Sequence, residues 1–489
     1  MNLAKITVLL IFLASAGSIF GQSKGTKVFR LSSQPTAMSI EARSSIASKR
    51  EAEISFDQAA VARIAGLNSI EIELFDGKTF VAERGSTEIR SLEDSTWRGK
   101  IDPNGKMLGD VVFTFRKGHV SGLIFSPDAV YEIVPRGDKH FLVELDQLAF
   151  PECAGEVKGE AAQRIESPSG GSDSGDRIDV LVVYTAAVRT SLGGDAQAQA
   201  VAQQAIDATN TSYINSRMRL RVRLVGAELT ALNETGSFST ELGNLRSDAA
   251  TANLRNDKNA DMVAMLTNST ASCGIGYLMG GQGGNPNNAF TVTARTCAVG
   301  NLSFAHELGH NMGSQHNPEN GSGPTYPYGF GHYVNGSYRT VMSYADPCTN
   351  GCTRVAYFSN PNVIFNGVPT GIINARDNAR SIDNTADWIA GYRYSGSSIT
   401  LGSLNTGEIA RRVAARTINW SSDNLTGNVR IELSRNGSVN WETIIADTDN
   451  DGSQTISITG RPTNQARIRV TSLTNPAVSD SSVINFRIQ

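Results

Sequence analysis

Three histidines and one glutamate lie within eleven residues in the middle of this 489-residue chain, which has only six histidines. His306 and His310 are four residues apart, so on a helix they share one face, one turn apart. Glu307 lies at the edge of that face, and Gly313 lets the chain turn so that His316 approaches the same point. Three neutral imidazoles and one open position form the ligand set of a catalytic zinc ion. We therefore predict one Zn²⁺ bound by the three histidines, with Glu307 as general base.

A second segment supports this metal site. Thr340-Val341-Met342-Ser343-Tyr344 follows the third histidine after a loop. A long zinc motif followed by such a methionine turn resembles the metzincin clan of metalloproteases. Residues 178–185, 358–361 and 377–380 are similar to the first strand and the closing segments of reprolysin-like bacterial proteases, a layout that peptidyl-aspartate metalloendopeptidases share. The resemblance covers residues 176–394 and is most specific at the metal site.

The resemblance implies roles for further residues. It implies a zinc endopeptidase acting on proteins or peptides, with Met342 as a hydrophobic floor under the histidines. Tyr344 stands where astacins and serralysins place a tyrosine that stabilises the transition state. Reprolysins usually have proline there, and an ordinary packed aromatic is the alternative. Gly276, Tyr277 and Leu278 fall where metzincins place the edge strand that captures an extended peptide, although an ordinary edge strand fits them equally.

Two features concern tuning and specificity. Reprolysins usually place aspartate directly after the third histidine, and this chain has Asn317. We expect this difference to tune the metal site without abolishing activity. Similarity to peptidyl-aspartate enzymes suggests an acidic preference, with Arg339 or Arg354 binding a carboxylate. The sequence alone favours surface or core-rim arginines at both positions.

The N-terminus has the pattern of a secretory signal peptide, predicted at residues 1–22. Lys5 precedes the apolar run Ile6–Leu13, and small residues follow as far as Gly21. The run is too short to span a bilayer, and a membrane anchor at this end is the alternative. We predict a secreted, extracellular protein with cleavage between Ala16 and Gln22.

Export makes the five cysteines interpretable, because oxidising compartments favour disulfides. Cys273, Cys297, Cys348 and Cys352 allow three pairings. We favour Cys273–Cys297 and Cys348–Cys352, and a structural zinc site made by all four thiolates is the alternative. The thiolate of Cys153 could occupy the open metal position, as in the cysteine switch of metzincin zymogens. A buried or intermolecular thiol competes with that interpretation.

The fold class predicted is multidomain α+β. Residues 23–153 alternate as short strands after an N-terminal helix and form a β-rich, removable propeptide. Residues 154–176 contain a Ser/Gly-rich stretch and form a flexible linker. Residues 177–394 form the metzincin-type catalytic domain, and residues 399–489 form an immunoglobulin-like β-sandwich. A permanent structural domain on a flexible hinge is the alternative to the propeptide.

Within the catalytic region, strands and helices alternate. Residues 178–184, 220–225 and 262–266 read as strands, and residues 195–217 have apolar side chains at helical spacing. The zinc helix is expected to begin near Ser303. These elements predict a mixed sheet backed by helices.

The C-terminal module and the overall charge narrow the partners. Asp447–Gly452 resembles the start of a calcium loop, but Ile458 stands where a bidentate glutamate is needed, so we predict a hairpin turn and leave structural Ca²⁺ possible but unsupported. Trp420 and Trp441 fit a core better than a ligand-stacking surface. The module could bind a surface or a polysaccharide. A net charge of −3 without a basic patch gives no indication of nucleic acid or membrane partners.

Two rival functions use the same residues. A binding protein with an inactive protease fold would be favoured by loss of Glu307 or of a histidine, and all four are present. A secreted metalloamidase acting on cell-wall peptides would use the same chemistry, and only substrate tests separate it from an endopeptidase.

Overall fold

The computed structural model describes residues 25–37, 47–91, 93–101, 109–162, 177–393 and 397–489, the last range with gaps at 406, 424, 439, 475–477 and 483. The predicted signal peptide, residues 1–22, lies outside the described residues, and so do residues 163–176 of the predicted linker. In the part of the chain that is described, no helix is long and apolar enough to cross a membrane. We call residues 25–162 the N-terminal domain, 177–393 the central domain and 397–489 the C-terminal module.

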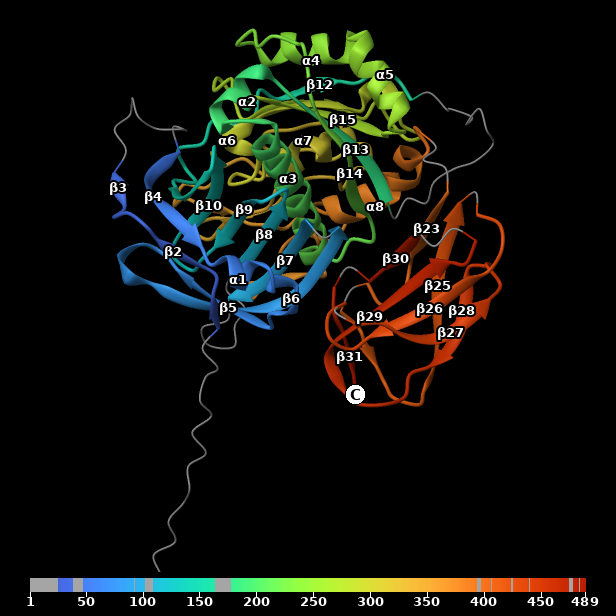
Figure 1. Ribbon diagram of the computed structural model, residues 1–489. Coiled ribbons are helices and arrows are strands. Elements are labelled where there is room, and N and C mark those ends of the chain that lie inside the picture. The colour runs from blue at the N-terminus through green and yellow to red at the C-terminus, as the bar shows by residue number, and fades with distance from the viewer. Residues whose placement is uncertain are drawn as a thin grey trace, which may run out of the picture.

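The N-terminal domain is built on an eleven-stranded sheet (Figure 1). Its strands are β1 (Thr26–Lys27), β2 (Phe29–Leu31), β3 (Thr36–Ala37), β4 (Ser48–Phe56), β5 (Ser69–Glu73), β6 (Thr79–Ser91), β7 (Asp94–Ile101), β8 (Gly109–Arg116), β9 (His119–Phe125), β10 (Val130–Arg136) and β11 (Lys139–Leu145). From β5 to β11 each strand pairs antiparallel with the next, and β11 then pairs with β4. Local hairpins therefore build most of the sheet.

Residues 38–46, part of the region where an N-terminal helix was expected, lie outside the described residues. The first helix of the described residues is α1 (Gln58–Val61), which is one turn long and is capped by Asp57. Residues 26–27 and 29–31 form strands instead, because their backbone groups pair with β5 and β4. Short 3₁₀ turns at Ile64–Gly66 and Phe75–Gly77 follow.

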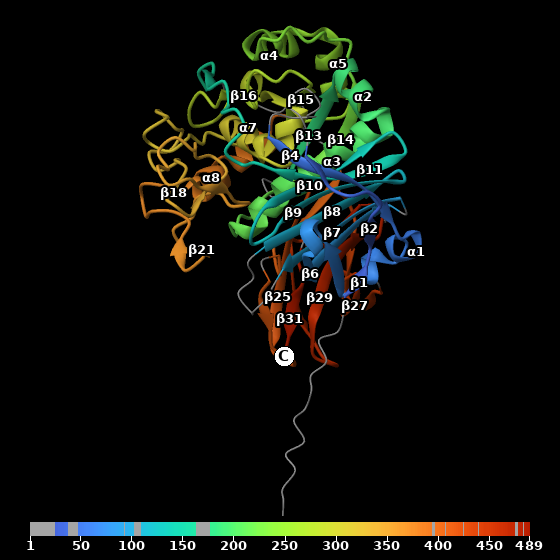
Figure 2. The same cartoon turned by 90° about the vertical axis from the view of Figure 1, so that its left-hand side faces the viewer.

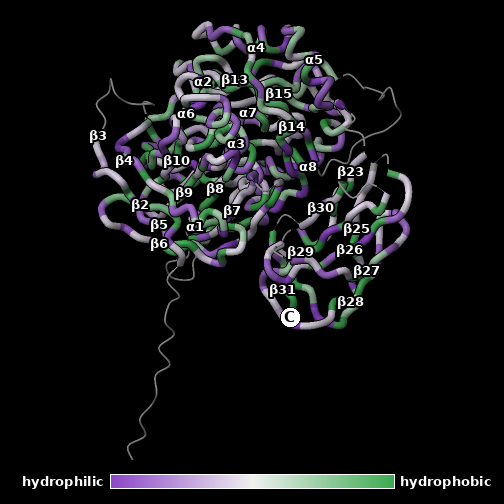
Figure 3. The backbone as a smooth tube through the Cα atoms, in the orientation of Figure 1, coloured by the Kyte–Doolittle hydropathy of each residue, from purple (hydrophilic) through white to green (hydrophobic). Residues whose placement is uncertain are grey.

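The central domain contains a mixed six-stranded sheet in the order β12-β16-β17-β15-β13-β14. The strands are β12 (Glu156–Lys158), β13 (Arg177–Tyr184), β14 (Arg221–Leu229), β15 (Met262–Thr267), β16 (Gly274–Leu278) and β17 (Phe290–Ala294). β13, β14, β15 and β17 are parallel, and β16 runs antiparallel to β17. Figure 3 shows hydrophobic residues along β13 and β15, as expected for parallel strands that are covered on both faces.

Helices cover both faces of this sheet. They are α2 (Ala186–Leu192), α3 (Asp195–Asn215), α4 (Phe238–Ser247), α5 (Ala249–Asp257), α6 (Arg295–Ala298), α7 (Ser303–Asn311) and α8 (Asn378–Ala390), and a 3₁₀ turn lies at Pro286–Asn288. Figure 1 shows α4 and α5 above the sheet, whereas α3 and α7 lie below it, between it and the N-terminal sheet. Mixed sheets with helices, the coarse part of the predicted fold class, are therefore present.

The segment after α7 is rich in loops. It contains the two-residue strands β18 (Tyr333–Val334), β19 (Tyr338–Arg339), β20 (Thr353–Arg354), β21 (Ile364–Phe365) and β22 (Val368–Pro369). Figure 2 shows β18, β21 and α8 on one side of α7. The loops therefore lie beside the helix that carries two of the predicted metal ligands.

The start of the predicted linker differs from expectation. Residues 156–158 form β12, which pairs parallel with residues 276–278 of β16. Backbone groups further along are also fixed, since Glu160 N–H donates to Asn288 Oδ1 at 2.8 Å and Ala161 O accepts from Asn285 Nδ2 at 2.9 Å. The side chains gave no sign of this strand, because its stability comes from β16 and not from its own three residues.

The C-terminal module has two sheets around a common core. One contains β23 (Ser398–Leu401), β25 (Ala415–Asp423) and β28 (Ser453–Ser457), and the other contains β24 (Ile409–Ala410), β26 (Val429–Ser434), β27 (Glu442–Thr448), β29 (Thr463–Ser472), β30 (Ser479–Ser481) and β31 (Phe486–Ile488). The interpretation as an immunoglobulin-like β-sandwich stays a prediction.

One turn in this module differs from the prediction. The segment Asp447–Gly452 joins β27 to β28, and these strands belong to different sheets, so the segment is a connection between sheets and not a hairpin turn. Trp420 is buried in the core and its Nε1 donates to Asn450 Oδ1 at 2.8 Å. The ring of Trp441 is covered by the guanidinium of Arg469 at 4.2 Å. Both tryptophans therefore have partners inside the module.

Candidate metal centre

Helix α7 and its C-terminal turn place three histidines at one point. His306 and His310 lie one turn apart on α7, and both are buried. The helix ends in a Schellman motif, in which Gly313 N–H donates to His310 O at 2.9 Å and Ser314 N–H donates to Gly309 O at 2.9 Å. Gly313 has φ +81°, a conformation that glycine adopts without strain. The reversed chain then brings His316 back toward the helix.

Backbone carbonyls orient the three imidazoles. The Nδ1 atoms of His306, His310 and His316 lie 2.9, 3.0 and 3.4 Å from the carbonyl oxygens of Val341, Ser314 and Asn320. A carbonyl only accepts hydrogen bonds, so each Nδ1 carries the proton and each Nε2 keeps a free lone pair. Burial lowers the pKa of His310 to about 4 and the pKa values of the other two well below their ordinary value, so all three are neutral at pH 7.

The spacing of the Nε2 atoms fits a metal ion. The Nε2 atom of His316 lies 3.0 Å from that of His310 and 3.2 Å from that of His306. Lone pairs on neighbouring atoms repel unless a cation lies between them. A tetrahedral zinc with bonds of about 2.0–2.1 Å separates two nitrogen ligands by roughly 3.3 Å. These residues therefore suit a tetrahedral metal.

Cys153 of the N-terminal domain completes the cluster. Its Sγ lies 3.4 Å from His316 Nε2, and the four possible ligand atoms all lie within 4.8 Å of one another. The Sγ is also 2.7 Å from Tyr344 Oη. Among the described residues this is the only group of three or more His, Cys, Asp or Glu side chains with such geometry, and the structure brings its members together from two domains.

Glu307 is buried beside the histidines without a hydrogen-bond partner for either carboxylate oxygen among the described residues. The carboxylate faces the start of β16, where a Cβ on Gly274 would approach Glu307 Oε1 to 2.4 Å. Burial raises the pKa of Glu307 well above its ordinary value, and the positive charge of Arg354 opposes that rise. A carboxylate in this position can accept a proton from a small molecule held beside the histidines.

The methionine turn packs under the helix. Met342 is fully buried, and a Cβ on Gly309 would approach its Sδ to 2.5 Å, so the thioether lies directly against α7. Tyr344 stacks near the histidines, with its ring centroid 4.0 Å from that of His316. The two side chains thus occupy the positions at the site that the sequence suggested.

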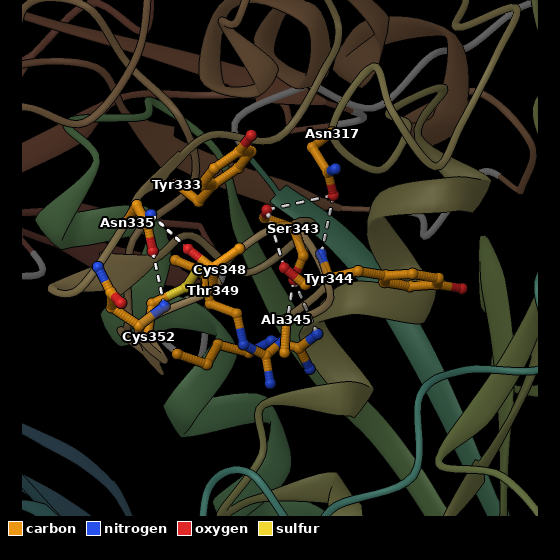
Figure 4. The surroundings of a disulfide bond; sticks show 12 residues. Asn317, Tyr333, Asn335, Ser343, Tyr344, Ala345, Cys348, Thr349 and Cys352 are labelled. Carbon is orange, nitrogen blue, oxygen red and sulfur yellow. Dashed lines mark hydrogen bonds between the residues drawn. A yellow bond between two sulfur atoms is a disulfide. The ribbon is translucent and has the colours of Figure 1, made fainter.

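The hydrogen bonds of Asn317 show why an amide suits this position, where reprolysins usually have aspartate. Its Oδ1 accepts hydrogen bonds from Ser343 Oγ at 3.2 Å and Tyr344 N–H at 3.0 Å (Figure 4), while its Nδ2 donates to Glu319 Oε2 at 2.9 Å. An aspartate could make the first two bonds, but it would place a second carboxylate against Glu319. The amide therefore joins the loop after α7 to the methionine turn without charge repulsion.

Two disulfides brace this region. Cys273–Cys297 joins the start of β16 to α6, and Cys348–Cys352 closes a short loop after the methionine turn (Figure 4). They join the pairs that the sequence analysis favoured. Cys153 is the one cysteine outside them.

The strand predicted to capture substrate does not lie at the edge of its sheet. β12 pairs with Gly276, Tyr277 and Leu278 and so covers the outer side of β16. Backbone bonds extend this contact toward the histidines, since Ala154 N–H donates to Gly274 O at 2.8 Å. Residues 152–162, which we call the covering segment, therefore occupy the position where an added strand would lie.

Two site residues, Glu152 and Glu156, were not identified from the sequence, because each contacts residues far away in the chain. Glu152 Oε1 accepts the Ala345 N–H at 2.9 Å, and Glu156 Oε1 accepts from Gln315 Nε2 at 2.6 Å. The only local signal was their place beside the free cysteine. Arg339 and Arg354, considered as surface or core-rim residues, are both buried next to this site.

A buried helix with His-Glu-x-x-His, a third histidine after a glycine turn and an underlying methionine turn define a metallopeptidase. Comparison with known proteins agrees: the model of metallo-peptidase family M12 matches residues 174–359. The peptidyl-Asp metalloendopeptidase of Stenotrophomonas maltophilia (strain R551-3) is 34% identical over 375 residues, which cover 70% of this chain and 86% of that one.

Two other peptidyl-Asp metalloendopeptidases are similar. That of Xanthomonas campestris pv. campestris is 31% identical over 365 residues, covering 70% of this chain and 85% of that one. That of Pseudomonas fragi is 30% identical over 187 residues, covering 38% of this chain and 99% of that one. The chain belongs to metallo-peptidase family M12 and is a peptide-bond hydrolase.

Proposed function

We propose that this chain is a secreted, zinc-dependent metalloendopeptidase that is made as a zymogen. The observation that carries the proposal is the convergence of three unprotonated Nε2 atoms beside the unpartnered carboxylate of Glu307. The signal-peptide pattern and the two disulfides support export. The names of the relatives support an aspartate at the cleaved bond of the substrate.

In the proposed mechanism His306, His310 and His316 hold Zn²⁺, and the carbonyls behind them fix their orientation. When bound, Zn²⁺ acidifies a water molecule and polarises the substrate carbonyl. Glu307 accepts a proton from the attacking water and passes it to the nitrogen of the leaving amine, so the proton count balances. Its burial supports this role, because burial raises the pKa of the carboxyl and makes the carboxylate a stronger proton acceptor.

Tyr344 is proposed to stabilise the oxyanion of the transition state. Its hydroxyl lies 2.7 Å from the Cys153 sulfur and is therefore next to the fourth metal position. After the thiol leaves, the same hydroxyl can donate to substrate oxygen. Met342 supports the histidines from below and takes no part in proton transfer.

The zymogen proposal rests on the covering segment. Cys153 lies at the histidine cluster, and residues 156–158 pair with the strand that an extended substrate would use. With Zn²⁺ bound, the thiolate of Cys153 would take the place of the catalytic water. Removal of the N-terminal domain would open both positions, and Gly276, Tyr277 and Leu278 would then accept substrate backbone.

The test compares wild type with Glu307→Gln, a change of almost equal volume, after matching zinc content and removing the N-terminal domain. We expect peptide hydrolysis to fall by about 10³-fold or more with zinc still bound, since general-base catalysis supplies factors of 10²–10⁴. Glu319→Gln, a change of the same type on the neighbouring loop, is the control. Equal rates for Glu307→Gln and wild type would contradict the assigned role.

A further inference from the structure

The side chain of Glu152, on the covering segment, lies between the backbone of Ala345 and the side chain of Arg354. It directly precedes Cys153, the residue at the histidine cluster. Its Oε1 accepts the Ala345 N–H at 2.9 Å, and its Oε2 lies 4.0 Å from Arg354 Nη2. Ala345 directly follows the methionine turn, residues 340–344. A carboxylate of the N-terminal domain therefore lies against the methionine turn, one residue before Cys153 at the histidine cluster.

Two buried arginines lie at the place that the Glu152 carboxylate occupies, which we call the pocket. Arg339 and Arg354 are 1% and 3% exposed. Arg339 Nη1 and Arg354 Nη2 both donate to Ser343 O, at 2.8 and 3.2 Å, so the two guanidinium groups lie side by side. Burial and the charge of Arg354 lower the pKa of Arg339 to about 9, which reflects the cost of holding two cations together.

The acids of the central domain act on these charges without forming an ion pair with them: Glu307 acts on Arg354, and Asp346 acts on Arg339. Within the described residues, the one carboxylate paired with Arg354 is that of Glu152, and Arg339 has no ion pair. The Nε atoms of both arginines are buried without a hydrogen-bond partner in the same part of the chain. Buried cations without a counter-charge are costly, so the pocket favours a carboxylate delivered from outside the central domain.

We propose that Ala345 N–H, Arg354 and Arg339 form a subsite for an acidic substrate side chain next to the cleaved bond, which Glu152 occupies as a substrate mimic in the zymogen. The inference rests on the proposed function and deepens it by assigning the residues that read the substrate. Two arginines provide a planar set of donors that suits a carboxylate better than an amide. Arg354 is the arginine nearer to the carboxylate and contributes more of the charge recognition than Arg339.

A structural ion pair explains the same contact less well. The carboxylate of Glu152 is 34% exposed and its closest approach to Arg354 is 4.0 Å, so it does not complete the coordination of the guanidinium. Its contribution as a fold-stabilising pair is therefore small. The acid also comes from the domain that is proposed to leave, whereas the arginines stay. This is the arrangement expected if Glu152 imitates the acidic side chain of a substrate and the arginines belong to the binding site.

The first test uses the activated wild-type protein and four peptides that differ at one position, with Asp, Glu, Asn or Ala after the cleaved bond. We expect kcat/KM for Asp to exceed that for Asn by about 10-fold to 100-fold, the usual effect of losing a charged hydrogen bond. Equal cleavage of Asp and Asn peptides would overturn the inference and leave the proposed function standing. Failure to cleave any peptide would instead contradict the proposed function.

The second test changes the pocket. In Arg354→Met the ratio of kcat/KM for Asp over Asn should fall below about threefold, with the loss on the Asp side. Arg255→Met is the matched control, because Arg255 is another buried arginine that bonds backbone carbonyls away from the pocket, at Ala260 O and Pro286 O. An unchanged ratio in Arg354→Met, or an equal fall in both variants, would overturn the assignment.

The third test avoids any buried change. Glu152→Gln in the unprocessed chain keeps the shape of the side chain and removes its charge, so the covering segment should compete less with an Asp peptide. We expect cleavage of that peptide by the unprocessed chain to rise by about 10-fold. Glu53→Gln, which breaks an exposed ion pair with Lys139 in the same domain, is the control. No rise in Glu152→Gln would contradict the mimic.

Discussion

The N-terminal domain contacts the central domain through two surfaces of different chemistry. On the first surface β7 and β8 pack on α3, where fully buried Asp207 accepts hydrogen bonds from Arg90 at 3.3 Å and Arg98 at 3.2 Å. On the second surface the covering segment lies along β16 with Cys153 at the histidines. The first surface is an internal ion-pair network, and the second uses groups that resemble a metal ligand and a substrate.

We infer that the α3 surface holds the N-terminal domain in place, whereas the covering segment carries the proposed inhibition. Breaking a buried ion pair is costly, so the α3 surface should set how firmly the domain is held. The covering segment has only three residues in β12 and partly exposed side chains, so it contributes less to stability. Its position at the site nevertheless decides whether the site can act. Mutations on the two surfaces should therefore change different measurements.

The largest effect is expected from Asp207→Ala. The change removes the fully buried acceptor that Arg90 and Arg98 share with Thr96 and Thr114, although both arginines keep Glu88 as a partner, and it should reduce the free energy of unfolding by about 3–5 kcal/mol. Urea unfolding of the unprocessed chain measures this loss. Gln199→Ala, on the same helix α3, removes two partly exposed hydrogen bonds, with Lys117 and with the Ala227 carbonyl, and should lower the free energy of unfolding much less. Equal midpoints for the two variants would remove the basis of the comparison.

A smaller effect is expected from Glu132→Gln, also between the two domains. Burial raises the pKa of Glu132 to about 7, although Arg295 and the Gly300 N–H oppose it. A raised folded-state pKa gives stability that is present below about pH 4.5 and lost as pH rises through 7. Wild type should therefore lose on the order of 2–3 kcal/mol between pH 5 and 8 that the variant keeps. Urea midpoints at both pH values test this; parallel curves for variant and wild type would contradict it.

Cys153→Ser should change activity more than stability. The hydroxyl is a poor zinc ligand, so the unprocessed chain should cleave peptides on the order of 10-fold faster, equivalent to about 1.4 kcal/mol. The urea midpoint should stay close to that of wild type because the α3 surface is intact. A variant that unfolds early without gaining activity would show that Cys153 serves attachment and not inhibition.

The smallest effect is expected from Arg246→Ala at the far end of the covering segment. Arg246 pairs with Glu160 at 3.0 Å, and both side chains are more than a third exposed. Such pairs contribute about 0–1 kcal/mol. Thermal unfolding should shift by no more than about 2 °C, as expected for a chain of this size. A larger shift would mean that the covering segment holds the domain more firmly than its contacts suggest.

The sequence predicted the local part of the site. Helix periodicity and a glycine turn are enough to bring His306, His310 and His316 near one another, because all three lie within eleven residues. Asn317 was noticed as a difference, but its role needed Glu319 and the methionine turn in their folded positions. The acidic partner of Arg354 lies some two hundred residues earlier in the chain and has no local signal.

The same limit applies to the fold. The apolar runs at residues 178–184 and 262–266 predicted β13 and β15 closely, because buried parallel strands are nearly continuous in apolar residues. Helix α3 was identified from its apolar residues, but its polar face is also buried, against the N-terminal sheet. A sequence pattern treats polar positions as exposed, so it could not reveal that Asp207 lies in an interface. β12 was missed because its partner strand lies more than a hundred residues away.

In the proposed zymogen the covering segment has one more consequence, which follows from its being joined to the domain whose site it covers. A tethered ligand meets its site at an effective concentration in the millimolar range, whatever the concentration of the protein. Contacts as modest as three strand residues, one thiol and one carboxylate can then keep the site filled. Once the chain is cut between the segment and β13, the α3 surface alone keeps the segment near the site. If the N-terminal domain then dissociates from α3, dilution would release the segment and make activation effectively irreversible.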